Sequence, residues 1–313
     1  MKTIAQFYTL FWIIYFPTCI AFNELDGFGW IDEIMTVILM AFTFLNSSVS
    51  LNREPRGEYR LFLGILAFYV VYGLIFGENI EKAVLRDMVQ WIRPFSVIYC
   101  TWILNPRFTE RQKNVMLISM LVTLGAWFLY HPEVNVGADA EFPVLGQLAM
   151  CTGMTWYLWK PDNQKNAYIA LAIVLSGMLA PKFKFMGEVV CFVGFVFFLR
   201  GKLQFKSPKT ILALVVLLAV TLYVTWEKFD IYYVSGLNSN ELARPMSYRI
   251  AFTEIIWDYF PFGPGMGTWG CAAAADYYSP LLYKYHMSRV WGCDPTNPMF
   301  VADAFYPTLA QLG

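Results

Sequence analysis

Apolar runs recur along most of this chain, each close to the length that crosses a lipid bilayer. One transmembrane helix needs about 17–25 mostly apolar residues, and the alternating pattern of an outer-membrane β-barrel is missing. The sequence therefore predicts an all-α fold, a polytopic integral membrane helix bundle. The nine expected spans are Ile4–Phe22, Trp30–Leu45, Leu61–Phe76, Met88–Leu104, Val115–Tyr130, Val144–Trp159, Ala167–Ala180, Phe185–Leu199 and Ile211–Trp226.

Composition supports a membrane protein. Charged residues make up 15% of the chain, whereas a soluble domain carries about 25%. The formal net charge is zero, so the charge balance gives no support to nucleic acid as a partner, and none is expected. Membrane lipids are the expected surroundings.

Lysine and arginine are concentrated in alternate loops, as the positive-inside rule requires of cytoplasmic loops. The intervening loops, such as Asn23–Phe28, are acidic or neutral, with Lys82, Lys182 and Lys184 as exceptions. This bias predicts a cytoplasmic N-terminus and an extracytoplasmic location for everything after Trp226. The basic loops carry Arg53, Arg56 and Arg60; Arg107, Arg111 and Lys113; Lys160 and Lys165; and Arg200, Lys202, Lys206 and Lys209.

Three regions follow from this topology. Residues 1–226 form the transmembrane bundle, residues 227–301 a long extracytoplasmic loop carrying an amphipathic helix, and residues 302–313 the start of a further transmembrane helix. The first span lacks a small-residue cleavage site and is interpreted as a retained helix. Because the last run is shorter than a span, we expect the protein to continue beyond Gly313.

Two arginines lie at the outer end of an expected span. Ionisable groups within a membrane mark a functional or a paired site. Arg86 and Arg93 are seven residues apart and share one side of a helix, whereas Asp87 points elsewhere. They are candidates for binding an anion. The alternative is that Arg86 reaches the lipid headgroups and Arg93 pairs with a buried carboxylate.

A short outer turn carries Lys182 and Lys184, with Glu188 one helical turn later. Two ammonium groups at the mouth of a bundle suit a phosphate group. The alternative is a pair between Lys184 and Glu188, with the other lysine reaching the headgroups.

The extracytoplasmic loop contains an amphipathic helix over Arg244–Tyr259, with Pro245 in its first turn. Such a helix lies along the membrane interface or caps a bundle. Arg244 and Arg249 lie near its N-terminal end, where a cation is unfavourable against the helix dipole. A bound anion would remove that penalty. The alternative is a pair of solvated arginines.

A glycine-rich turn follows this helix and matches the pattern GxGxxG at Gly265, Gly267 and Gly270. A dinucleotide fingerprint needs a strand before it and a helix after it, and here a helix precedes it. We therefore reject a nucleotide site. The glycines are expected to let the backbone approach a ligand or another helix closely.

The loop also holds candidate groups for proton transfer. His286 is its one histidine, and Asp303 stands just before the last apolar run. Either would serve as a general base, although His286 also fits an ordinary surface residue. No cofactor and no metal site is expected. Cys271 and Cys293 are disulfide candidates in an oxidising compartment, with two separate thiols as the alternative.

The stretch from Arg249 to Gly270, with WDYFPFGPGMGTWG at its end, resembles the signature of the O-antigen ligase and O-antigen polymerase superfamily. In that family an arginine opens an amphipathic helix that ends in proline and a Gly-x-Gly-x-Gly turn. The sequence likeness runs from about Arg244 to the end, and the topology is similar throughout. Two positions depart from the family: Asp303 stands where ligases have a histidine, and the element near the eighth span reads KFKFMG.

The resemblance implies a metal-independent membrane glycosyltransferase of the bacterial inner membrane. Its donor would be an undecaprenyl-diphosphate-linked glycan, with Arg249, Arg244, Arg93, Arg86, Lys182 and Lys184 holding the diphosphate. A glycan acceptor would be activated by Asp303 or His286. Because Asp303 replaces the ligase histidine, we expect a surface polysaccharide polymerase. The alternatives are an O-antigen ligase acting on lipid A–core, a transporter or flippase for an anionic lipid-linked substrate, and a scaffold subunit.

Overall fold

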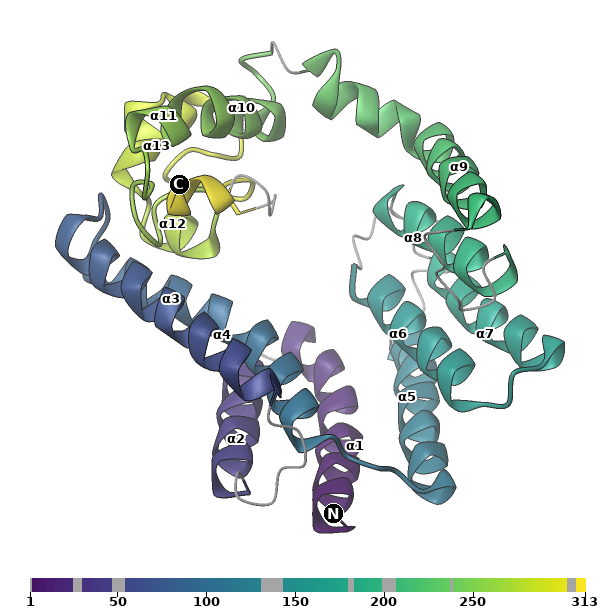
Figure 1. Ribbon diagram of the computed structural model, residues 1–313. Helices are drawn as coiled ribbons and strands as arrows, with labels where there is room; N and C mark the ends of the chain where they lie inside the picture. The colour runs from purple at the N-terminus through teal and green to yellow at the C-terminus, as the bar shows by residue number, and fades with distance from the viewer. Residues whose placement is uncertain are drawn as a thin grey trace. The chain divides into compact units, whose positions relative to one another are not determined.

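The computed structural model describes residues 2–24, 30–46, 54–130, 143–179, 183–198, 207–236, 239–302 and 308–313. These residues form helices and no strands, so the all-α prediction is confirmed (Figure 1). A helix occupies each of the nine expected spans. They are α1 (Lys2–Glu24), α2 (Ile31–Leu45), α3 (Glu54–Phe76), α4 (Glu81–Leu104), α5 (Glu110–Tyr130), α6 (Pro143–Trp159), α7 (Gln164–Ser176), α8 (Phe183–Val193) and α9 (Pro208–Tyr233).

Among the described residues, three helices are long and apolar enough to cross a membrane. They are α3 over Arg56–Phe76, α5 over Glu110–Leu129 and α9 over Pro208–Tyr233, with mean hydropathies of 1.9, 1.3 and 2.0. Only 11% of the most apolar part of α3, and none of that of α9, is buried within the protein. These surfaces indicate membrane association. For the other expected spans, crossing of the membrane stays a prediction.

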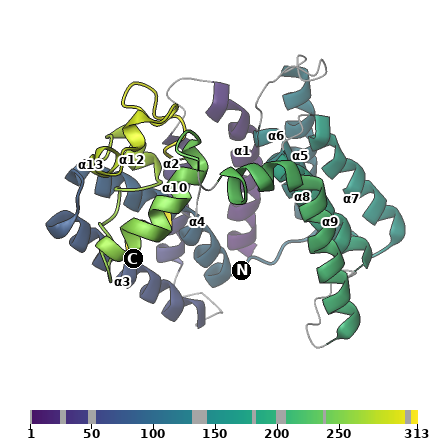
Figure 2. The ribbon, with the colours of Figure 1, turned by 90° about the horizontal axis from the view of Figure 1, so that it is seen from above.

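The chain divides into two units, Met1–Ile31 with Pro106–Phe229, and Asp32–Asn105 with Asp230–Gly313. In the first unit α5 packs on α1 and on α6, and α8 packs on both α6 and α7 (Figure 2). In the second unit α3 packs on α4, which also contacts the loop. The loop expected from residue 227 therefore shares a unit with α2–α4, and α9 continues to Tyr233 before the loop begins.

The expected helix over Arg244–Tyr259 is present, with Pro245 in its first turn. Its middle is π-helical, because the N–H of Ile256 donates to the carbonyl of Ala251, five residues earlier. The sequence pattern did not predict this wider turn. The loop elements are α10 (Ala243–Ile250), the π segment (Ala251–Ile255), α11 (Ile256–Asp258), α12 (Ala272–Asp276), α13 (Pro280–Lys284), and the 3-10 turns Met287–Arg289 and Ala310–Leu312.

The loop has a hydrophobic core of its own. Trp269 is 1% exposed and its ring meets that of Tyr285 edge to face, with centroids 5.8 Å apart. The buried side of α10, including Met246 and Ile250, packs into the same cluster as Leu281 of α13. The amphipathic helix thus buries its apolar side within a folded loop layer.

The glycine-rich turn packs directly against the end of α3 and the start of α4. Gly263, Gly265, Gly267 and Gly270 all have positive φ, from 66° to 96°. A Cβ on Gly265 would lie 3.0 Å from the Cα of Gly77. Both the positive φ and the close contact exclude a side chain. The expectation that these glycines let the backbone approach another helix closely is therefore confirmed.

Gly267→Ala tests how strongly this turn holds the loop. Gly267 has a φ of +78°, and an added Cβ would lie 2.7 Å from the carbonyl carbon of Ala83 in α4. We expect a loss of about 2 kcal/mol or more of unfolding free energy, from the left-handed backbone and the overlap. Thermal unfolding in detergent measures it. Gly64→Ala on α3, where nothing lies within 4 Å of the added atom, should leave stability unchanged or slightly higher. Equal losses in the two variants would contradict this account.

Candidate functional site

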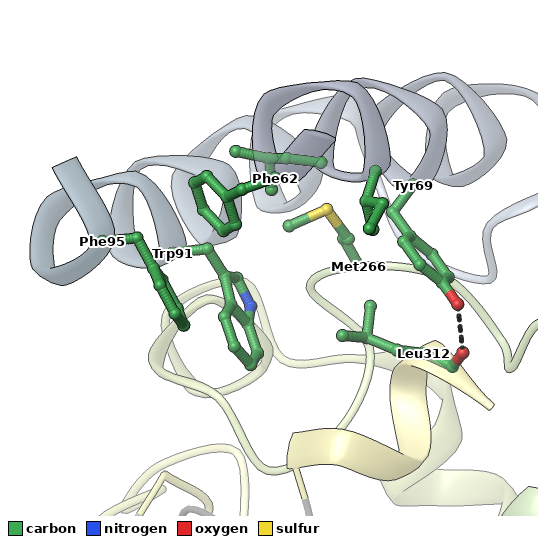
Figure 3. Close-up of a pocket in the computed structure, with 8 residues that line it drawn as sticks. Phe62, Tyr69, Trp91, Phe95, Met266 and Leu312 are labelled. Atoms are coloured by element: carbon green, nitrogen blue, oxygen red, sulfur yellow. Dashed lines mark hydrogen bonds between the residues drawn. The ribbon is translucent and has the colours of Figure 1, made fainter. Parts of the chain in front are cut away.

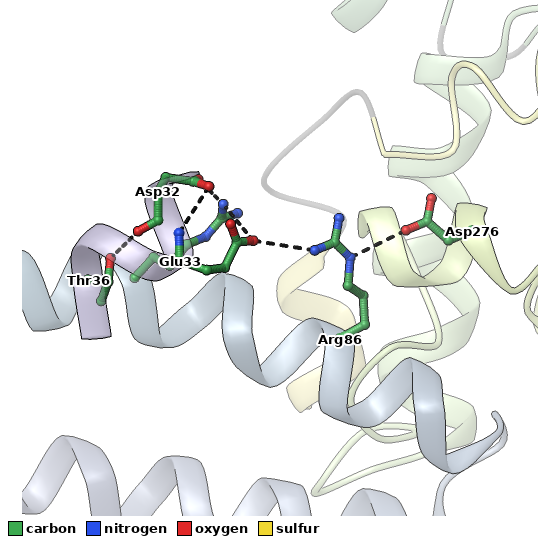
Figure 4. Close-up of polar contacts among 6 residues, drawn as sticks. Asp32, Glu33, Thr36, Arg86 and Asp276 are labelled. Atoms are coloured by element: carbon green, nitrogen blue, oxygen red, sulfur yellow. Dashed lines mark hydrogen bonds and ion pairs between the residues drawn. The ribbon is translucent and has the colours of Figure 1, made fainter. Parts of the chain in front are cut away.

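The two arginines of α4 converge on one carboxylate at the start of α2. Oε1 of Glu33 accepts from Nη1 of Arg86 at 3.4 Å and from Nη1 of Arg93 at 3.2 Å. Arg93 also pairs with Asp32, and Nε of Arg86 lies 3.4 Å from Oδ2 of Asp276 in α12 (Figure 4). The prediction that Arg86 and Arg93 share one side of a helix is confirmed.

This cluster of Asp32, Glu33, Arg86, Arg93 and Asp276 carries three carboxylates against two guanidinium groups. Glu33 is 9% exposed, and its Oε2 is buried and accepts no hydrogen bond from the described residues. The arrangement matches the alternative interpretation of Arg93, as partner of a buried carboxylate. Arg86 connects α2 to the loop in the same way. A diphosphate here would have to displace these carboxylates.

The loop arginines have different surroundings, and both are half-buried. Nη1 of Arg244 donates to the hydroxyl of Tyr232 at 2.6 Å, and its guanidinium lies over the rings of Tyr232 and Phe300, at 5.1 and 5.5 Å from their centroids. Nη2 of Arg249 donates to Oδ1 of Asn240 at 2.6 Å. Aromatic faces attract cations, so the structure holds Arg244 in place instead of leaving it solvated.

Both guanidinium groups lie toward the N-terminal end of α10. Arg244 belongs to the first turn. Arg249 belongs to the last turn, and its side chain reaches back to Asn240, which precedes the helix. Leu242 occupies the N-cap position and supplies no side-chain hydrogen bond. A helix N-terminus carries a partial positive charge and unsatisfied N–H groups. Two cations and an uncapped helix end together form the part of the loop best suited to an anion.

The other predicted residues are less informative. Asp303 and Lys182 lie outside the described residues, as does the side chain of Lys184. Glu188, which follows the two lysines in sequence, accepts on Oε1 from Nε2 of Gln147 at 3.3 Å. His286 is exposed, has a φ of +60° and begins a short 3-10 turn. This placement fits the ordinary surface residue.

The expected disulfide does not form in this structure. Cys271 and Cys293 are both buried in the loop core and are not bonded to each other. Sγ of Cys271 instead accepts from the N–H of Ala274 at 3.3 Å and caps α12. Burial raises the pKa of the Cys271 thiol well above its usual value, so the thiolate needed for oxidation is disfavoured.

A buried polar network joins the glycine turn to α4, and sequence reasoning missed it. Oδ2 of Asp87 accepts from the N–H of Gly267 at 3.1 Å and from Nε2 of Gln311 at 2.7 Å. Oε1 of Gln311 in turn accepts from the N–H of Thr268 at 3.2 Å. The N–H groups of Gly267 and Thr268 therefore bond to side chains within the protein and are not available to a phosphate.

Beside this network lies an apolar cavity of about 120 Å³. Met266 and Leu312 form one side, facing Phe62 and Tyr69 of α3 and Trp91 of α4 (Figure 3). Its lining is aromatic and aliphatic, so it suits hydrocarbon and not a sugar or a phosphate.

Glu33→Ala tests whether the cluster of α2, α4 and α12 is structural. The change removes the carboxylate that both arginines share, whereas Asp276 and Asp32 remain as their other partners. Because hydrogen bonds to charged groups are lost on both arginines, we expect a loss of about 2 kcal/mol of unfolding free energy. Glu110→Ala is the matched control, because Glu110 pairs with Lys113 while its own side chain is 76% exposed. That change should cost less than about 1 kcal/mol. Thermal unfolding of both variants in detergent makes the comparison, and equal costs would contradict a structural role.

Comparison with known proteins adds no family to this geometry. No protein-family model matches the chain, and neither a curated protein nor a solved structure matches it. A statement of function therefore has to rest on the residues themselves.

Proposed function

We propose that this chain is a membrane glycosyltransferase that uses a lipid-diphosphate-linked oligosaccharide as donor and a glycan as acceptor, and that it extends a surface polysaccharide. Its place is the bacterial inner membrane, with the loop after Trp226 on the extracytoplasmic side. The resemblance of residues 249–270 to the O-antigen ligase and polymerase superfamily supports this function, as does the surface chemistry of the loop.

One observation carries the proposal: Arg244 lies in the first turn of α10, whose N-cap residue supplies no side-chain hydrogen bond, and the side chain of Arg249 reaches back from the last turn to Asn240 before the helix. Cations at that end are unfavourable in isolation and favourable once an anion is bound. Guanidinium also matches the paired oxygens of phosphate groups. Arg244 and Arg249 are thus candidates for the diphosphate. At Arg86 and Arg93 a diphosphate would have to displace Glu33 and Asp32.

In the proposed transfer reaction, the arginines of α10 stabilise the leaving group. The acceptor hydroxyl attacks the anomeric carbon of the donor sugar. The bond between that carbon and the diphosphate oxygen breaks, and lipid diphosphate leaves with a growing negative charge. Fixed cations that meet this charge lower the barrier. Asp303 stays the candidate base. His286 is a weaker candidate for this role, because it occupies an exposed position in a turn.

Arg249→Ala should shorten or abolish the polymer while leaving the protein folded. Losing a fixed donor to developing charge costs about 10²- to 10³-fold in rate, and gel profiling of the cell's polysaccharide reads this as short products. Arg249→Lys should retain part of the activity, since it keeps the charge and loses the fork geometry.

Arg289→Ala is the matched control, because Arg289 is an exposed arginine of the same loop. Its polymer should be normal. Unchanged length and yield in Arg249→Ala, at normal protein levels, would refute the diphosphate site. Full-length polymer held on the lipid carrier would instead identify a ligase.

A further inference from the structure

We propose that the glycine turn and the turn at Ala310–Leu312 form a re-entrant element: they lie alongside α3 at the depth of the membrane hydrocarbon, with Phe260 and Phe262 against lipid. The leaflet is the one at the C-terminal end of α3. This assignment goes beyond the proposed function and does not depend on glycosyl transfer.

The depth follows from the partners of these turns on α3. The hydroxyl of Tyr72 donates to the carbonyl of Gly263 at 3.0 Å, and that of Tyr69 donates to the carbonyl of Leu312 at 2.7 Å. Met266 packs beside Leu66. These α3 residues precede its end at Phe76 by about one to three turns, or roughly 5–15 Å. Since α3 carries no charged residue from Leu61 to its end at Phe76, that stretch lies within hydrocarbon when α3 spans the membrane.

Irregular backbone at such a depth is tolerated only where the protein satisfies its polar groups. The turn meets this condition. The N–H of Gly265 donates to the carbonyl of Gln311 at 3.1 Å, and that of Gly267 to Asp87. Where the turn reaches the level of Glu78, the carbonyl of Gly267 accepts from Nδ2 of Asn79 at 2.5 Å. With these partners the irregular backbone can lie away from water.

The outer surface of the turn is aromatic and continues the exposed surface of α3. Phe260 is 72% exposed and Phe262 is 45% exposed. The Phe262 ring lies edge-on to that of Phe68, with centroids 5.5 Å apart, and Phe68 is itself 48% exposed on α3. Ile75 farther along α3 is 65% exposed. A lipid that covers α3 therefore also covers Phe262.

A charged group marks where this apolar surface ends. The Tyr259 hydroxyl donates to Oε1 of Glu78 at 3.2 Å and accepts from Nζ of Lys284 at 3.0 Å, while Lys284 lies 3.8 Å from Asp258. Glu78 comes just after α3 ends. This level suits headgroups and water, and Trp257, 69% exposed next to Asp258, suits the interface.

Spin labels on the full-length chain in nanodiscs test the element. The six native cysteines are first replaced, and Phe260→Cys and Phe262→Cys are then labelled one at a time. Val71→Cys, on the exposed surface of α3, is the lipid control, and Arg289→Cys, exposed in the loop, is the aqueous control. Collision rates with oxygen, which partitions into lipid, are compared with those of a water-soluble nickel complex.

We expect oxygen-to-nickel ratios at residues 260 and 262 that are close to the ratio at residue 71 and several-fold above that at residue 289. Ratios close to that at residue 289 would overturn the proposal, as would an aqueous ratio at residue 71. If the cysteine-free chain does not fold, a photoreactive benzoylphenylalanine replaces Phe260 in the unaltered chain. A lipid adduct by mass spectrometry supports the element. A crosslinked dimer, or a chain without a lipid adduct, overturns it.

Discussion

A single carboxylate fixes the position of two irregular segments. The glycine turn and the C-terminal turn lack the internal hydrogen bonds of a long helix, so their polar groups need partners from elsewhere. Asp87 of α4 supplies one oxygen to both. Another side of the same helix carries Arg86 and Arg93, which hold α2 and α12 through carboxylates. The loop is therefore fixed to α4 and, through Arg86, to α2.

The charges of this region divide into two kinds. Those on α4 are compensated within the protein, and breaking such a pair is far more costly than the pair is stabilising. Their role is to keep the helices and the loop together. Those at the start of α10 are positioned by a hydroxyl, an amide oxygen and aromatic rings. The proposed diphosphate site rests on the fork geometry of these two guanidinium groups.

Much of the fold followed from local pattern, and much of the site did not. The apolar runs predicted where the helices lie, and the glycine spacing predicted a close approach of the backbone to another helix. The seven-residue separation of Arg86 and Arg93 predicted that both lie on one side of α4. Partner identity was beyond such reasoning, because Asp87 meets Gly267 and Gln311 across 180 and 224 residues. Gln311 is a neutral side chain in a short apolar run, with no pattern to reveal it. One signal for the partners of the two arginines was available in the sequence. Asp32 and Glu33 stand at the expected outer end of the second span, and Arg86 and Arg93 stand near the expected outer end of the fourth.

The π segment at Ala251–Ile255 lies between the loop cations and the loop aromatics. A wide turn contains one more residue than an α-turn, so it changes the rotation of everything that follows. The guanidinium of Arg249 and the indole of Trp257 thus take their relative directions from this irregularity. Removing one residue there would turn one against the other by about 100°. The loop would keep its helix, yet Arg249 and Trp257 could no longer take the proposed positions toward phosphate and lipid together.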